Sequence, residues 1–591
     1  MQTLGYEEEL PQEEMIEQDH ELLKLSDEVL AGLKKDIIQG MSSWQSAISA
    51  PQTSWDAWEA MYNDDPNASG VPPEGFEWSH FPLIRPHIRS LVASLMQAVT
   101  AHSPWVQMMA TRDASIVTEE LGPNGELIQK EVPGVEVMSQ AAEIVHNVIQ
   151  KHGGLQAIKM VLRNTFIQGG RGVLYVAPAV DDDELLEMEV IDGRNFCFDP
   201  PYVKHLWDER LMMMGHRTFM PLSMVNELIE SGELYDVSLA PSSSEAEGMR
   251  VSQYTPVAGG EIENQTEHIW TLFKKCSLKK GAPKEWYRII YAGGAQEILG
   301  VYKHDLGYNH YIDFAEEPES NKFIKAGSIA GSLSPIQHMY TNALGTLDLG
   351  SQMSAFPYMF AIGMTTTDMF KAKMGQVTSV PHGVQIQVVK TEFDPSTIPL
   401  LTEKLEEVAG TITGTSRAGT GGELSQNTTA TEAQGYFMAQ SKTEQGYIND
   451  LACSFERLYA TVHMMLLKHP QWAEKVLYGI ADGNWVQILE AAVGCRYVLA
   501  GNVLTNSVIN RQQLAQTLLP LTADPRYGID LYELGRFTID TMADGPVKER
   551  LQKPKEVVDA EIAQQQAIQF AAMASEGRDS GAGADSGEQT A

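Results

Sequence analysis

Positive charge is scarce in this sequence. The 591 residues include 43 lysines and arginines against 78 aspartates and glutamates, which gives a formal net charge of −35. A protein that holds DNA tightly neutralises phosphates with clustered cations, so this balance argues against a surface that grips DNA. Hydrophobic residues make up 43% of the chain. That content is enough to bury large cores in about two to four domains and argues against wholesale disorder.

Cysteines and long apolar runs are also rare. The four cysteines are widely spaced and form neither a CxxC pair nor a Cys/His cluster with zinc-ligand spacing, so we expect no disulfide framework and no structural zinc. Such a composition fits a reducing cytoplasm. The longest apolar run, residues 355–364, is too short to span a bilayer. The acidic N-terminus lacks the basic and apolar regions of a signal peptide, so we expect no export by that route.

Motifs for catalysis are missing as well. The glycine-rich residues 419–422 lack the lysine of a phosphate-binding loop, and the chain has no HExxH motif. Residues 414–418 do not form a GxSxG elbow, because they end in alanine. Asp181, Asp182 and Asp183 have the chemistry to bind a divalent cation, but a solvated turn is the better interpretation. We therefore predict a chain that is not an enzyme, with no catalytic residue, no metal ligand and no cofactor.

Hydrophobic periodicity predicts an α+β fold that is mainly α. Helical spacing indicates helices over residues 21–40, 86–99, 138–151, 155–168, 220–233, 334–355, 399–412, 429–468 and 510–574. Strand-like segments cover residues 171–177, 186–191 and 384–389, and residues 112–134 indicate a loop or hairpin. Alternation over residues 267–275, 286–291 and 298–302 predicts a small antiparallel module.

The β-rich segment also holds the one dense basic spot of the chain. Its loop, KKCSLKKGAPK, contains five lysines: Lys274, Lys275, Lys279, Lys280 and Lys284. An acidic partner surface or passing DNA would suit these charges. A hairpin tip also often carries lysines for solubility alone, so the loop does not by itself identify a partner.

Residues 410–459 carry the most distinctive string, GTITGTSRAGTGGELSQNTTATEAQGYFMAQSKTEQGYINDLACSFERLY. A helix that ends in a TGT turn, a glycine- and serine-containing link, and NTTATEA opening a long polar helix together resemble the region before the crown of tailed-phage portal proteins, particularly those of short-tailed phages. Further pieces are similar to the wing of the same family: FPLIRPHIRSLVASLMQAV, GGRGVLYV and VIDGRNFCFDPPYVKHLWDER. The similar pieces follow the family's order over residues 81–459.

The resemblance implies a ring of identical subunits, usually twelve, at a unique capsid vertex. Double-stranded DNA passes through its channel during packaging and ejection, driven by a separate ATPase. The implied partners are the terminase large subunit, a head–tail adaptor, and the major capsid and scaffolding proteins, with no membrane. The implied location is the virion, with assembly in the host cytoplasm. An acidic channel wall would let a duplex slide, whereas neutralised phosphates would hold it back.

The same resemblance implies a portal-like wing, stem, clip and crown architecture. Its boundaries follow the predicted elements along the chain. The expected parts are a mobile acidic arm (1–20), an N-terminal wing (21–219), a stem helix and connection (220–262), a β-rich clip (263–323), a returning stem helix (324–356), a tunnel-loop region (357–390), a wing segment with the long helix (391–470), crown helices (471–574) and a disordered tail (575–591).

Candidate site residues follow from these assignments. Lys371 and Lys373 would touch DNA from the tunnel loop, although a surface loop with two solvated lysines fits equally well. The lysine loop would lie at the clip tip. Small residues of the returning stem helix would pack against the neighbouring subunit, or serve ordinary tight packing: Ala343, Gly345, Gly350, Ser351 and Ala355. The long helix would begin at the family motif Asn427, Thr428, Thr429 and Glu432, with a threonine cap and a favourable carboxylate in its first turn.

Two other classes of protein stay open at this point. Another virion core, adaptor or scaffold protein would share the acidity and the helix content. Two stem helices flanking the β module would distinguish a portal from such a scaffold. A nuclease or phosphotransferase that uses Asp181, Asp182 and Asp183 would instead show Mg²⁺-dependent turnover.

Overall fold

The structure is a computed structural model that describes residues 22–65, 68, 81–100, 103–109, 116–121, 127–132, 134–178, 186–237, 239, 266–279, 282–304, 308–316, 328–355, 358–362, 385–389, 396–415, 430–478 and 485–499. All of them belong to one structural unit, Met1–Ala500. The fold is α+β and mainly α, as predicted. No helix in this described part is long and apolar enough to cross a membrane.

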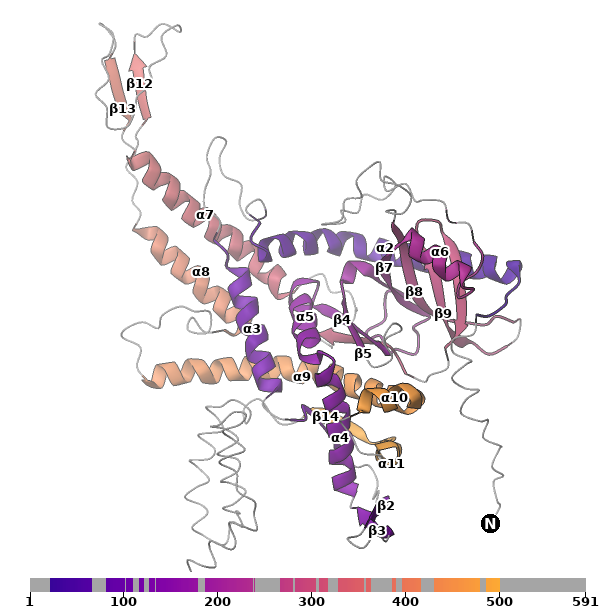
Figure 1. Cartoon of the computed structure of the whole chain (residues 1–591). Helices are drawn as coiled ribbons and strands as arrows, with labels where there is room; N and C mark the ends of the chain where they lie inside the picture. The colour runs from indigo at the N-terminus through magenta and orange to yellow at the C-terminus, as the bar shows by residue number, and fades with distance from the viewer. Residues whose placement is uncertain are drawn as a thin grey trace, which may run out of the picture. The chain divides into compact units, whose positions relative to one another are not determined.

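A five-stranded antiparallel sheet lies at the centre of the N-terminal half (Figure 1). Its order is β10-β9-β8-β7-β6, with β6 at Phe196–Asp199, β7 at Met213–Pro221, β8 at Thr266–Cys276, β9 at Glu285–Ala292 and β10 at Glu297–Lys303. The three strands predicted in the β-rich segment are confirmed. They do not form a separate module, however, because β8 pairs with β7 from Met213↔Lys274 to Pro221↔Thr266. The sheet therefore joins the range 263–323 to the range 21–219.

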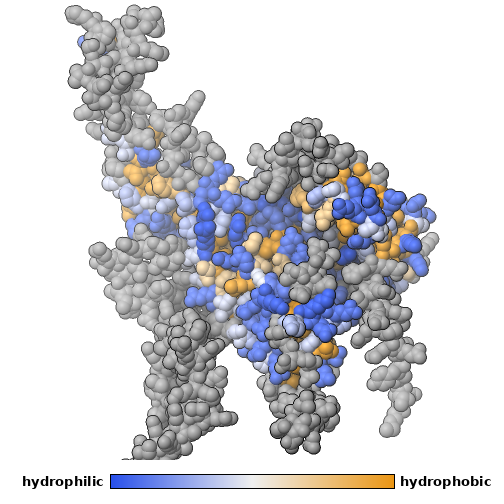
Figure 2. Space-filling model, in the orientation of Figure 1, coloured by the Kyte–Doolittle hydropathy of each residue, from blue (hydrophilic) through white to orange (hydrophobic). Residues whose placement is uncertain are grey.

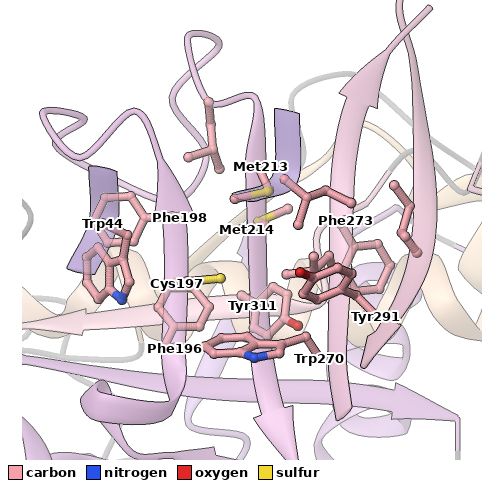
Figure 3. Packing of buried hydrophobic residues seen from close by; sticks show 14 of the residues in the cluster. Trp44, Phe196, Cys197, Phe198, Met213, Met214, Trp270, Phe273, Tyr291 and Tyr311 are labelled. Atoms are coloured by element: carbon pink, nitrogen blue, oxygen red, sulfur yellow. The ribbon is translucent and has the colours of Figure 1, made fainter. Parts of the chain in front are cut away.

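The last strand of residues 263–323, β11, belongs to a second, three-stranded sheet. β11 (Tyr311–Ala315) pairs with β4 (Arg171–Pro178), which also pairs with β5 (Leu186–Ile191). The ring of Tyr311 on β11 lies 5.1 Å from that of Phe196 on β6, so the two sheets share one core (Figure 3). Burial of these aromatic side chains supplies much of the hydrophobic stabilisation.

Helix α2 (Asp27–Tyr62) packs on this core, where Trp44 lies 4.5 Å from Phe198 between ring centroids (Figure 3). The prediction of a helix over 21–40 is wrong at both ends. The helix starts later because Leu22 pairs with Tyr302 and the Leu23 N–H donates to the Val301 carbonyl oxygen, which keeps these residues extended. It continues past residue 40 because further apolar side chains on the same helix are buried: Ile48, Trp55 and Met61.

Helix α6 (Leu222–Glu230) covers a smaller cluster with Val225, Ile269 and Leu299. It is shorter than the predicted 220–233. Met220 and Pro221 are the last residues of β7, and Ser231 ends the helix through a backbone bond to the Glu227 carbonyl. Because α6 has nine residues, it does not form a long stem helix of the kind expected for residues 220–262.

Four further helices confirm periodicity-based predictions: α3 (Ile84–Val99), α4 (Gly134–Lys151), α5 (Gly154–Ile167) and α9 (Ala430–Lys468). Helices α10 (Pro470–Leu477) and α11 (Trp485–Ala491) were not predicted, and the helical section predicted over residues 510–574 lies outside the described residues. The hairpin interpretation of residues 112–134 is confirmed by β2 (Ile116–Leu121) and β3 (Leu127–Val132), and β1 (Val106–Met109) pairs with β14 (Arg496–Leu499). Helix α9 packs against β11, where Phe455 meets Phe314 edge to face.

Buried histidines connect these elements. The Nδ1 atom of His146 on α4 lies 2.7 Å from the Tyr459 hydroxyl of α9, and that of His216 on β7 lies 2.7 Å from the Tyr311 hydroxyl. Burial lowers the pKa of both histidines from 6.5 to about 4. These side chains therefore stay neutral in the folded protein at neutral pH.

We expect stability to fall as pH drops from about 6.5 towards 4. In that window an unfolded histidine binds a proton that the buried one does not, which costs up to about 1.4 kcal/mol per pH unit for each histidine. The midpoint of denaturant unfolding, measured across this range, checks the effect. A His146→Gln/His216→Gln double variant should lose less stability per pH unit than the unchanged chain. An equal slope in both proteins would contradict this assignment.

Candidate functional site

Two long helices lie side by side and carry a strand pair at one end (Figure 1). Helix α7 (Ile329–Ala355) leads into β12 (Tyr358–Ile362), and β13 (Gln385–Val389) leads into α8 (Thr397–Thr413). The strands are antiparallel, with Tyr358 opposite Val389. Between the helices, the Tyr340 hydroxyl donates to Glu406 Oε1 at 2.9 Å. Two long helices with a β element between them were expected around residues 263–323. Here they are α7 and α8, with β12 and β13 between them in the chain.

Gln337 fixes α7 to the start of α3. Its side chain is fully buried. The Oε1 atom accepts hydrogen bonds from the backbone N–H groups of Leu83 and Ile84, at 2.6 and 3.2 Å, and the Nε2 group donates to the Phe81 carbonyl at 2.6 Å. No side chain of its own caps α3, so Gln337 supplies from another helix an acceptor for N–H groups at the helix start that have no partner within the helix.

His87 fixes α8 to the same helix. Its Nδ1 atom lies 3.2 Å from the Thr413 hydroxyl and 2.9 Å from the Thr415 hydroxyl. Burial lowers the pKa of His87 to about 4, so the ring is neutral and its unprotonated nitrogen can accept. Gly414 between the threonines has φ 69°, the left-handed conformation that ends α8. We call Gln337, His87, Thr413 and Thr415 the α3 clamp.

The sequence analysis did not identify Gln337 or His87 of the α3 clamp, and it pointed to the two threonines only through one signal. The TGT turn at residues 413–415 was singled out as the end of a helix, and it contains both threonines. Nothing local marks the contacts of Gln337 and His87 with other elements, because the partners in those contacts lie more than 250 positions away in the chain. A buried glutamine and a buried histidine are recognised only once the fold brings the elements together.

The helix pair carries little positive charge. Lys404 is the one Lys or Arg among the residues of α7 and α8, against the carboxylates of Asp348, Glu403, Glu406 and Glu407. Lys404 Nζ lies 2.5 Å from Glu407 Oε2, which neutralises it locally. Hydrophobic residues also reach the surface over this pair (Figure 2), among them Leu400 and Val408, which are 62% and 47% exposed. The pair is therefore acidic with an apolar stripe.

The small residues predicted for α7 fall into two groups. Ala343, Gly345 and Gly350 are buried within the single chain, and Ser351 is exposed. The side chain of Ala355 is outside the described set. Burial of the first three is consistent with ordinary tight packing.

The lysine loop is only partly exposed. Lys274 lies inside β8 and is 7% exposed, so it does not present a free charge to a partner. Lys275 is half-buried, while Lys279 and Lys284 are exposed. Lys280 lies outside the described residues. The available positive charge of this loop is therefore smaller than the sequence suggested.

Several other predicted site residues lie outside the described residues. They are Lys371, Lys373, Asn427, Thr428, Thr429 and the aspartates 181–183. Helix α9 begins at Ala430, one residue after the predicted start, and contains Glu432 in its first turn.

A buried ion pair between β4 and β11 lies beside a cavity in the described part of the chain. Arg171 Nη1 on β4 donates to Asp313 Oδ2 on β11 at 2.9 Å. The adjoining cavity of about 230 Å³ is also lined by His205, Trp207 and Asp450. No group of three or more His, Cys, Asp or Glu side chains within the described ranges has a geometry suited to a metal ion. The ion pair has the burial and geometry of a structural contact between strands.

Replacing Gln337 by leucine should loosen the base of the helix pair. The change leaves two buried N–H groups and a carbonyl without their partner, at a cost of about 2–4 kcal/mol. Thermal unfolding of the variant measures the loss. Asn342→Leu, at an exposed position of the same helix, is the matched control and should change stability by less than about 0.5 kcal/mol. Equal effects of the two substitutions would rule out the capping role of Gln337.

Comparison with known proteins agrees with the resemblance drawn from the sequence. None of the curated proteins compared with the chain gives a significant match. Residues 107–521, which make up most of the chain, match the family model described as phage SU10 portal protein. Portal families are structural and non-enzymatic. The chain therefore belongs to the phage SU10 portal protein family and is a portal protein of short-tailed-phage type, a virion component that connects head and tail and serves DNA packaging.

Proposed function

We propose that α7 and α8 form the stem of this portal and that β12, β13 and the residues between them form its clip. The order and packing of the elements support this assignment, because α7 and α8 lie side by side and the paired strands β12 and β13 fall between them in the chain. The sheet of residues 263–323 is preceded by a nine-residue helix and shares strands with residues 21–219. It fits the wing better than the clip that we expected there.

The new boundaries change the part of the portal to which two predicted DNA-facing lysines are assigned. Lys371 and Lys373 fall between β12 and β13 in the sequence, so they belong to the proposed clip rather than to a tunnel loop. The lysine loop of residues 274–284 then lies in the wing. Clip residues would contact the terminase large subunit during packaging and the head–tail adaptor afterwards.

The charge of the stem supports a channel that does not retain DNA. One lysine and four carboxylates give the helix pair a net charge of −3. A duplex beside such a wall forms few phosphate contacts, and few counterions are released, so sequence-independent binding stays weak. A separate ATPase can then move the DNA against little electrostatic resistance.

We further propose that copies of the chain close into a ring, with twelve as the expected number. The exposed apolar residues of α8, Leu400, Leu401 and Val408, are suited to contact a stem helix of the next copy. The ring would be assembled in the host cytoplasm with scaffolding and major capsid proteins. We expect it to need no cofactor and to turn over no substrate.

A charge reversal on the stem tests the proposed channel lining. Glu403→Lys/Glu407→Lys raises the charge by four per subunit where DNA would pass, so we expect DNA packaging in vitro to fall about tenfold at low salt and to recover as salt rises. Glu209→Lys/Glu230→Lys makes the same change at exposed positions outside the stem and should package normally.

The comparison between the two double variants decides the assignment. Both must first be shown to assemble as the unchanged chain does, by size and by electron microscopy. Equal packaging by the stem variant and the control would place α7 and α8 away from the DNA path. A salt-dependent defect confined to the stem variant supports the lining.

A further inference from the structure

Lysines gather at one end of the five-stranded sheet. The register places Lys303 of β10 opposite Tyr287 of β9, and Lys275 of β8 opposite Trp286. The β8–β9 connection beyond this end carries the exposed Lys279 and Lys284. Among the described residues, neither of these two lysines is within ion-pair distance of a carboxylate.

The chain enters the described structure at the edge strand of the same sheet. Leu22 forms an antiparallel bridge with Tyr302, and the Leu23 N–H donates to the Val301 carbonyl at 3.0 Å. The Tyr235 hydroxyl donates to the Leu23 carbonyl at 2.5 Å, which holds this entry point in place. The first described residues, Leu22 and Leu23, are therefore already paired with β10.

The antiparallel register sets the direction of the preceding residues. With Leu22 opposite Tyr302, Glu21 comes opposite Lys303, and a bond from the Lys303 N–H to the Glu21 carbonyl would complete the pair. Each earlier residue then lies further towards the end of the sheet that carries the lysines. Opposite charges at facing positions stabilise such a pair.

Residues 1–21 have the composition to match this surface. They contain eight acidic residues and no lysine or arginine. Pro11 cannot donate to a strand partner, which limits any continuous pairing to the residues after it. Residues 12–20 span about 30 Å when extended, since each adds about 3.3 Å, whereas two strand spacings are about 10 Å. The acidic side chains after Pro11 can therefore reach Lys279 and Lys284.

We propose that Glu21 extends the pairing along β10 to Lys303, the last residue of that strand, and that residues 12–20 of the same chain continue past this end of the sheet, where their carboxylates cover the lysines. The occupant is the chain's own N-terminal segment because the bridge at Leu22 already sets its register. Covering these lysines removes an exposed cationic surface of the wing. The segment thus acts as an internal counter-charge that keeps DNA away from a place where it would be retained. The inference does not depend on which helices line the channel.

Zero-length carbodiimide cross-linking of the assembled full chain, followed by mass spectrometry, tests the proposal. The reagent joins a carboxylate to an amine only when the two are in contact. We expect residues 13–21 to be linked to Lys279 and Lys284 at least tenfold more often than to Lys159, an exposed lysine of α5. High salt should reduce these links. Rings assembled from isotope-labelled and unlabelled chains distinguish links within one chain from links between chains.

Three results would overturn the proposal. The first is equal linking of the segment to Lys159 and to the loop lysines. The second is linking only between labelled and unlabelled chains, which would assign the segment to a neighbouring copy. The third is protection of Lys279 and Lys284 by added duplex DNA to the same extent with and without residues 2–20, which would make the lysines a DNA contact. A Lys279→Gln/Lys284→Gln variant controls for folding, because it should assemble normally and lose the specific links.

Discussion

The projecting helix pair depends on buried polar contacts with one helix of the body. α3 receives α7 through Gln337 and α8 through His87, so both helices are fixed at the same place. The two contacts are costly to break, because each leaves buried donors or acceptors without partners. The surface of the helix pair is mainly polar with an apolar stripe, so the pair has little core of its own. The direction in which α7 and α8 project is therefore set where they contact α3.

Charge is distributed according to the same logic. The helix pair that would line a channel has a single lysine, which is held by Glu407. Exposed lysines of the loop lie instead at the end of the five-stranded sheet, on the side where the acidic N-terminal segment joins it. Under the proposed assignments, a net charge of −35 suits surfaces that leave DNA free to move.

Local patterns predicted local structure well. Helices α3 and α5 and strands β4 and β5 each follow a hydrophobic period that their own residues determine. The pairing of β7 with β8 was not predictable, because no short-range pattern records which strand lies beside which. For the same reason the β-rich segment was interpreted as a separate module. Strand β13 was predicted, at residues 384–389, but its pairing with β12 was not.

The site was less predictable than the fold. Small residues in α7 and the TGT turn drew attention to α7 and to the end of α8, yet the residues that fix these helices to α3, Gln337 and His87, have no distinguishing neighbours in the sequence. The start of α2 was misplaced because residues 22–26 are extended by their contact with β10, a tertiary effect that outweighs helical spacing. In each case the difference between prediction and structure comes from contacts with residues that are distant in the sequence.

A three-dimensional reconstruction of the assembled particle by electron cryo-microscopy tests the central claim most directly. The account predicts a closed ring in which α7 and α8 of every copy surround one central opening, with their bases seated on α3 through Gln337 and His87. A particle without an axial opening, or one whose opening is lined by the five-stranded sheet while α7 and α8 face outwards, would contradict it.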